Sequence, residues 1–158
     1  MLVGGAALAL SACSSKFKKY SGPEVTRLQV VKERRRLYIF HHQTLLEDYK
    51  IHLGNNATGP KRFRGDGRTP EGTYYIDRRN PRSSFHLSLG ISYPNAEDVA
   101  YARAAGRDPG GDIFIHGGRR KKDPRGKDWT AGCIAVNDRQ MEDIYAMVRR
   151  GTPIDIFA

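Results

Sequence analysis

A cysteine and a histidine in the second half of the chain have the surroundings that nucleophilic catalysis requires. Cys133 follows a glycine at the start of an apolar run, and His116 ends another apolar run and precedes two glycines. A cysteine nucleophile needs a base that forms the thiolate, and backbone N–H groups that face the developing oxyanion. Cysteine and histidine are also ordinary core and surface residues, so this spacing alone does not establish a catalytic pair.

Several motifs around these residues resemble the L,D-transpeptidase catalytic domain family, whose fold is of the YkuD type. His116-Gly117 resembles its His-Gly motif, and Thr130-Ala131-Gly132-Cys133 resembles its Ser/Thr-x-Gly-Cys motif. Residues 69–74 resemble a turn of the family, and the segments 85–89, 92–95, 128–129 and 133–136 resemble one branch of it. The resemblance extends from about Val25 to the C-terminus, and its motifs are specific when taken together.

The resemblance implies an acyl transfer on peptidoglycan stem peptides. Cys133 would attack the carbonyl at the L-centre of the diamino acid, the terminal D-Ala would leave, and the thioester would pass to an amine. His116 is expected to serve as the base, oriented by a hydrogen bond from Thr130. The backbone N–H groups of Ala131, Gly132 and Cys133 are the expected oxyanion donors. No cofactor is implied, and no residues have metal-ligand spacing.

Two positions depart from the commonest form of the family and leave alternatives open. Ala131 stands in place of a second histidine, and Ala135 stands where Arg or Asn is usual. These differences indicate a divergent branch and concern the acceptor more than the nucleophile. With water as acceptor, the protein would be an L,D-carboxypeptidase. With a protein-linked stem as donor, it would be an amidase that releases an anchored lipoprotein. A non-catalytic, wall-binding lipoprotein is the third alternative.

The candidate substrate-binding residues lie in or near these motifs. They are Gly117, His86, Tyr93, Lys61 and Trp129. His86 could equally be a strand histidine packed against an aromatic neighbour, and Trp129 is more typical of packing than of ligand binding.

The remaining sequence predicts a mainly β fold with minor α, a single YkuD-type, sandwich-like domain over residues 25–158. Alternating β-branched and aromatic residues favour strands at 25–31, 37–40, 45–53, 73–77, 85–91, 112–116 and 152–157. Residues 59–72, rich in glycine, are expected to form a loop. Asn95 and Asn137 are suited to cap helices at 95–105 and 138–150, and the second, after Cys133, is the clearer.

The N-terminus resembles a signal peptide for lipid attachment. Residues 1–13 are an apolar stretch that ends in small residues and Cys13, which resembles the bacterial lipobox. The alternative is a buried N-terminal element with a core cysteine. Cys13 is therefore predicted to carry lipid, residues 14–24 to form a polar tether, and the domain to lie in the periplasm on the inner or outer membrane.

The chain is strongly basic and long enough for one domain. It has 158 residues, with 27 Lys and Arg against 17 Asp and Glu, a net charge of +10. The cations concentrate in three segments, at 61–68, 78–82 and 119–127. Carboxylates of peptidoglycan stems and phosphates of lipids are the expected anions, and a plain solvated surface is the alternative. Nucleic acid is not expected as a partner, because no motif for binding it occurs.

Overall fold

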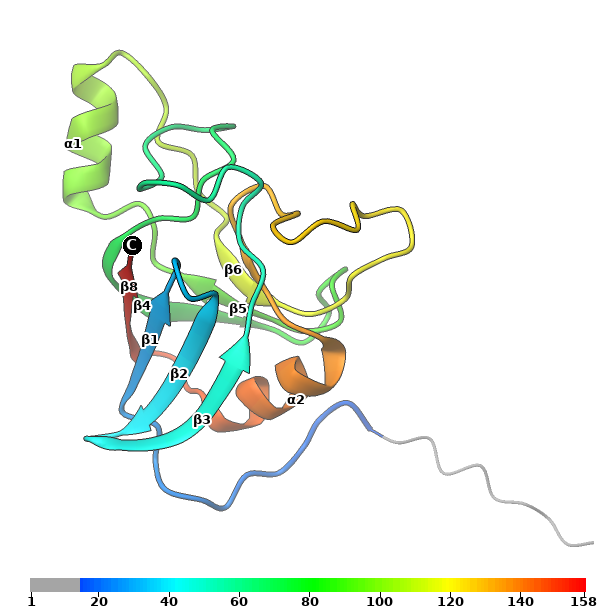
Figure 1. Ribbon diagram of the computed structural model, residues 1–158. Helices are drawn as coiled ribbons and strands as arrows, with labels where there is room; N and C mark the ends of the chain where they lie inside the picture. Colours follow the sequence, from blue (N-terminus) through cyan, green and yellow to red (C-terminus); the bar gives the residue numbers. More distant parts are fainter. Residues whose placement is uncertain (1–14) are drawn as a thin grey trace, which may run out of the picture.

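The computed structural model of the protein describes residues 15–158 (Figure 1). The predicted signal segment and Cys13 lie outside the described residues. In the described part of the chain, no helix is long and apolar enough to cross a membrane.

The described chain forms one eight-stranded sheet and two helices. In chain order the elements are β1 (Arg27–Val31), β2 (Arg36–His41), β3 (Thr44–Lys50), β4 (Gly72–Asn80), β5 (Ser88–Ile91), α1 (Ala96–Ala104), β6 (Phe114–His116), β7 (Ile134–Ala135), α2 (Asp138–Met147) and β8 (Pro153–Phe157). The strand order across the sheet is β3-β2-β1-β8-β4-β5-β6-β7. Most neighbours are antiparallel, but β1 pairs with β8 and β6 pairs with β7 in parallel.

The long strand β4 joins the two halves of the sheet and makes it curl. Its first residues pair with β8, its last residues pair with β5, and the register shifts between Ile76 and Arg78. Beyond β3 the chain returns to the other edge, where His52 pairs with Ala135 and Gly54 bridges to Thr130. These bridges bring the two ends of the sheet together at the segment that contains Cys133.

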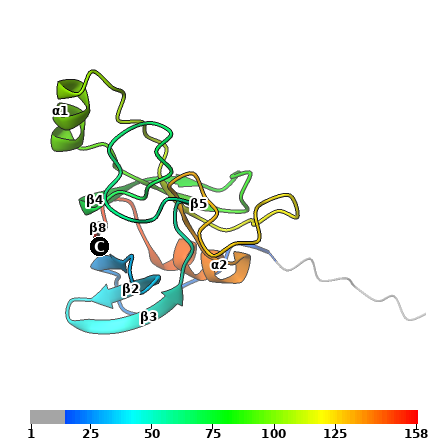
Figure 2. The ribbon, with the colours of Figure 1, turned by 45° about the horizontal axis from the view of Figure 1, so that its top comes forward.

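The core lies inside the curl because alternate side chains of each strand point inward. Leu28 and Val30 of β1 are fully buried, as are Leu37 and Ile39 of β2. Helix α2 adds Met141, Ile144 and Tyr145, whose spacing of three and four residues places them on one face, and Val148 just after the helix is also buried. Figure 2 shows the segments 54–71 and 117–129 as long loops that project from the sheet, and Gly117 of the second loop packs on α2.

The predicted mainly β fold, with a helix after Cys133, is confirmed, and several boundaries differ. Both predicted helices form, and each has a capping box at its asparagine. Helix α2 ends at Met147 rather than Arg150, because Val148 is extended (ψ 132°) and the chain turns toward β8. Strand β5 begins only at Ser88, because residues 85–87 belong to a turn-rich loop.

Candidate active site

The register of the last strands places Cys133 and His116 on the same face of the sheet. Strand β6 pairs with β7 in parallel, with Ile115 beside Ile134 and His116 beside Ala135. Side chains alternate along a strand, and neighbours in register point to the same side. Cys133, one residue before β7, therefore shares a face with His116, while Ile115 and Ile134 point into the core.

The same face continues across the neighbouring strands as a polar row. Ser88 of β5 is directly opposite His116, and Asn80 of β4 is directly opposite Ser88. Adjacent strands are about 4.8 Å apart, so these side chains lie side by side. The fold thus extends the histidine's neighbourhood with an amide and a hydroxyl.

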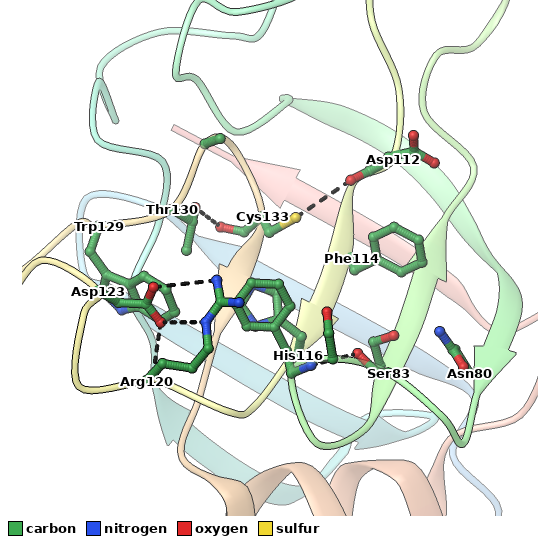
Figure 3. A pocket seen from close by; sticks show the side chains of 14 residues that line it. Asn80, Ser83, Asp112, Phe114, His116, Arg120, Asp123, Trp129, Thr130 and Cys133 are labelled. Atoms are coloured by element: carbon green, nitrogen blue, oxygen red, sulfur yellow. Dashed lines mark hydrogen bonds and ion pairs between the residues drawn. The ribbon is translucent and has the colours of Figure 1, made fainter.

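A pocket of about 430 Å³ opens over this row (Figure 3). We call it the base-side pocket; its lining residues are Asn80, Ser83, Ser84, Phe85, Ser88, Asp112, Phe114, His116, Arg120, Asp123, Trp129, Thr130, Ala131 and Cys133. Figure 3 shows Phe114 and His116 on one strand and Cys133 beside the neighbouring strand, with Arg120 and Asp123 on the loop that lies next to them. Cys133 and His116, the predicted nucleophile and base, therefore line the same pocket.

His116 is held in one orientation by its neighbours. Its Nδ1 lies 2.8 Å from the carbonyl oxygen of Gly117, and a carbonyl only accepts, so Nδ1 carries the proton. The ring centroid lies 4.5 Å from that of Phe85 and 5.7 Å from that of Trp129. Nε2 is consequently unprotonated and basic, which is the state that a proton acceptor requires.

Burial keeps the imidazole neutral. His116 is only 4% exposed, and its removal from water lowers its pKa from the ordinary value. The carbonyl of Gly117 and the carboxylate of Asp123 act in the opposite sense, while Arg120 adds to the lowering. An imidazole in this state can accept a proton at neutral pH.

The thiol of Cys133 is also neutral at rest. Burial raises its pKa, and the negative charge of Asp112 raises it further. The backbone N–H of Phe114 and the charge of Lys61 lower it and only partly offset that rise. Sγ lies 3.5 Å from the carbonyl oxygen of Asp112. A neutral thiol and a neutral imidazole in the same pocket suit proton transfer during attack rather than a preformed ion pair.

Thr130 holds the nucleophile's own turn rather than the base. Its Oγ1 donates to the carbonyl oxygen of Cys133 at 2.6 Å and accepts from the N–H of Gly132 at 3.2 Å. Within residues 15–158 it makes no hydrogen bond to His116, so the orienting role predicted for it is wrong. Gly117 and the flanking aromatic rings orient the imidazole instead.

The turn also narrows the set of oxyanion donors. The N–H of Gly132 is already bonded to Thr130, which corrects its predicted role. The N–H groups of Ala131 and Cys133 have no acceptor among the described residues.

Gly132 has φ +135°, and a Cβ there would lie 2.6 Å from the carbonyl oxygen of Arg68. Only glycine permits this close approach of the 54–71 segment to the turn.

Of the five predicted substrate-binding residues, Trp129 alone lines the base-side pocket. Tyr93 is buried, and its hydroxyl donates to the carbonyl of Pro109. His86 faces α2, where its Nε2 lies 3.0 Å from Glu142. Gly117 packs on α2, because a Cβ there would lie 2.8 Å from Asp138. These three residues support the site from behind and do not line it.

Lys61 lines a second pocket, on the other side of Cys133. We call this space of about 260 Å³ the lysine-side pocket; it is lined by Lys61, Arg64, Gly65, Gly110, Gly111, Asp112, Ile113, Ala131 and Cys133. The ammonium of Lys61 is buried and bonds to Asp66 and to the carbonyl of Phe63, each at 2.9 Å. Lys61 therefore contributes charge at this pocket while its hydrogen bonds remain internal.

Sequence reasoning missed the polar row and Asp112. Asn80 and Ser88 reach the pocket through strand register, which no local motif encodes, and Ser83 and Ser84 line it from the loop between β4 and β5. Asp112 has φ +55°, an uncommon backbone for a non-glycine residue, and lines both pockets. The described residues contain no group of three or more side chains arranged to hold a metal ion.

The curled sheet and the cysteine–histidine pocket define the class of protein. The model of the L,D-transpeptidase catalytic domain (YkuD) matches residues 26–156, and the chain belongs to this family.

A curated relative aligns with nearly all of the chain. An Escherichia coli (strain K12) protein named "Putative L,D-transpeptidase YafK" is 28% identical over 150 residues, which are 91% of this chain and 55% of that protein. The chain thus spans about half the length of the curated relatives it matches.

Solved structures share the fold. The helical cell shape determining protein Pgp2 from Campylobacter jejuni aligns with a TM-score of 0.64 and 24% identity, over 87% of this chain and 49% of that chain. The L,D-transpeptidase of Enterococcus faecium, solved as a C442S mutant, aligns with a TM-score of 0.55 and 16% identity, over 85% and 50% of the two chains.

Proposed function

We propose that this protein is a cysteine acyltransferase that acts on peptidoglycan stem peptides. Cys133 is the nucleophile, His116 is the general base and acid, and the N–H groups of Ala131 and Cys133 bind the oxyanion. One observation carries the proposal: strand register brings Cys133 and a neutral, oriented His116 to one face of the sheet in one pocket. Family membership supports the choice of substrate.

The first half-reaction forms a thioester. Nε2 of His116 takes the proton of the Cys133 thiol as Sγ attacks the carbonyl at the L-centre of the diamino acid. The tetrahedral oxyanion is stabilised by the two backbone N–H groups. His116 then returns its proton to the leaving nitrogen, and D-Ala departs as the C–N bond breaks.

The second half-reaction resolves the thioester with an amine. The amine attacks the thioester carbonyl, His116 accepts its proton, and Sγ leaves and is reprotonated. Cys133 lines the lysine-side pocket as well as the base-side pocket. This second approach supports a reaction in which donor and acceptor reach the same sulfur from different sides.

Hydrolysis is the second candidate fate of the thioester. Ala131 is exposed and small, and it lines both pockets beside Cys133. A small side chain leaves room for water as acceptor, which would make the protein an L,D-carboxypeptidase. A donor stem linked to a protein would make it an amidase by the same chemistry.

A single assay tests the enzyme and separates the fates of the thioester. The full chain is incubated with disaccharide-tetrapeptide, and the products are identified by mass spectrometry. Cross-linked dimer or an exchanged terminal D-amino acid indicates transfer, and tripeptide without dimer indicates hydrolysis. The Cys133→Ala variant should form none of these products. Absence of all products with the unmodified protein would contradict the proposal.

We also propose that lipid on Cys13 anchors the protein to a membrane in the periplasm. The lipobox-like residues before Cys13 and the basic charge of the chain support this location. Labelling of cells with a palmitate analogue should mark the unmodified protein and leave a Cys13→Ala variant unmarked. Equal labelling of both would contradict lipid attachment at Cys13.

A further inference from the structure

The first described residues lie against the domain in an extended conformation. Along residues 15–19 the side chains alternate, with Lys16 and Lys18 half-buried and Phe17 and Lys19 exposed. Figure 1 shows this segment, in blue, passing below α2. The ring centroid of Phe17 lies 6.4 Å from that of Tyr145 on α2. Lys16 and Lys18 both face the domain, where Lys16 reaches the loop that follows β4 and Lys18 reaches α2.

Lys16 binds both ends of the loop formed by residues 81–87. Its Nζ donates to the carbonyl oxygen of Pro81 at 2.8 Å and to that of His86 at 3.0 Å. The two carbonyls lie at opposite ends of the 81–87 loop, so one ammonium closes it. Hydrogen bonds from a charged donor are stronger than those between neutral groups.

Lys18 supports the 81–87 loop through α2. Its Nζ lies 2.7 Å from Asp143 and 3.5 Å from Oε2 of Glu142. The other oxygen of Glu142 lies 3.0 Å from Nε2 of His86. Both lysines are therefore connected to His86: Lys16 binds its carbonyl oxygen, and Lys18 contacts Glu142, which lies beside its side chain.

The 81–87 loop forms one wall of the base-side pocket. Ser83, Ser84 and Phe85 line that pocket, and the Phe85 ring packs on His116 at 4.5 Å. The backbone of Phe85 also lies so close to Gly118 that a Cβ there would collide with it at 2.4 Å. A shift of this loop would therefore change the surroundings of the catalytic histidine directly.

We propose that Lys16, assisted by Lys18, is a positioning residue that fixes the 81–87 loop so that Phe85 stays packed on His116. Its effect on turnover rests on the proposed function, but its effect on the loop does not. Lys16 and Lys18 also follow Cys13 closely in the sequence, so the segment that leads to the proposed anchor is the one that holds the 81–87 loop.

Loosening of the 81–87 loop would change the pKa of His116, because that pKa depends on burial. Removal from water is the largest cause of its lowered pKa, and Phe85 covers one side of the ring. If the 81–87 loop loosens, water reaches the imidazole and its pKa rises toward the ordinary value. A role confined to holding the N-terminal segment would leave this pKa unchanged.

The direct test is hydrogen exchange in the full chain, with Lys16→Met compared with Lys19→Met. Lys16→Met removes the charge and keeps most of the side chain's length, while the exposed Lys19 makes no hydrogen bond or ion pair within residues 15–158. Amides of 82–87 should exchange about fivefold faster in Lys16→Met, since a net hydrogen bond contributes about 1 kcal/mol. Lys16→Arg should largely restore protection. Unchanged exchange in β8 will confirm folding of each variant.

The second readout is the NMR titration of His116. Its pKa should rise in Lys16→Met and stay unchanged in Lys19→Met. Equal exchange and equal His116 titration in the two variants would overturn the inference. If exchange and titration respond as expected but the unmodified protein forms no muropeptide product, the positioning role stands and the proposed function fails.

Discussion

The two pockets that meet at Cys133 differ in chemistry. The base-side pocket has a neutral histidine, aromatic rings, hydroxyls and an Arg120–Asp123 pair, while the lysine-side pocket has the cations Lys61 and Arg64 and no aromatic ring. Their common residues are Asp112, Ala131 and Cys133. The difference indicates a division of labour, in which proton transfer belongs to one side of the sulfur and recognition of charge to the other.

The comparison of the two pockets predicts that loss of the imidazole of His116 has the largest effect on catalysis. His116→Gln should lower kcat/KM for tripeptide or dimer formation by about 10²–10⁴-fold, because glutamine cannot accept the thiol proton. The matched control is His41→Gln, at the end of β2, which should keep the unmodified rate. A loss below tenfold in His116→Gln would contradict the assignment of proton transfer to the base-side pocket.

The turn between the pockets should give the next largest effect. Thr130→Val removes the hydroxyl that binds Gly132 N–H and Cys133 C=O. The unfolding free energy should fall by about 1–3 kcal/mol, because buried polar groups lose their partner. Urea unfolding measures this change, and Thr130→Ser, which keeps the hydroxyl, should lose less than half as much. Equal losses in the two variants would show that the hydroxyl does not hold the turn.

The lysine-side pocket should affect binding more than chemistry. Arg64 is exposed there, and its guanidinium lies 2.7 Å from Asp108. Arg64→Gln should raise KM by about fivefold at most with kcat unchanged, as expected for a solvent-screened charge. Arg139→Gln, an equal charge change on the exposed face of α2, should leave KM unchanged. A fall in kcat with constant KM would contradict the division between the pockets.

The smallest expected effect is a shift in the pH at which kcat/KM and the alkylation of Cys133 change. Burial lowers the pKa of His116, so the base stays unprotonated and the acid limb of kcat/KM should fall below about pH 6.5, the ordinary histidine value. The pKa of the thiol is raised, so its alkylation by iodoacetamide should accelerate only above about pH 8.5. An acid limb above pH 6.5, or alkylation with an inflection near neutrality, would indicate a resting ion pair instead.

The sequence was sufficient to predict the fold and the family. Alternation identified most strands, and Asn95 and Asn137 marked both helix starts, because these signals are local. The motifs around His116 and Cys133 led to the family that the model match confirms. Ends of elements were less predictable: α2 stops at Met147 because the chain must reach β8.

Most of the residues around the pair could not be predicted, because long-range pairing places them. Asn80 and Ser88 reach His116 only through the register of three strands. Tyr93 and His86 have residue types suited to binding, yet their partners are Pro109 and Glu142, away from the base-side pocket. Thr130 lies in the predicted motif, but only the geometry of the turn reveals that its hydroxyl binds Gly132 and Cys133.

The most direct test of the proposed chemistry is the mass of the enzyme during turnover. The full chain is mixed with disaccharide-tetrapeptide, quenched in acid and digested, and the peptide that contains Cys133 is weighed. The mechanism predicts an adduct equal to the substrate minus D-Ala on Cys133, and none on that peptide in Cys133→Ala. An adduct on another residue, or product formation by Cys133→Ala at the unmodified rate, would contradict it.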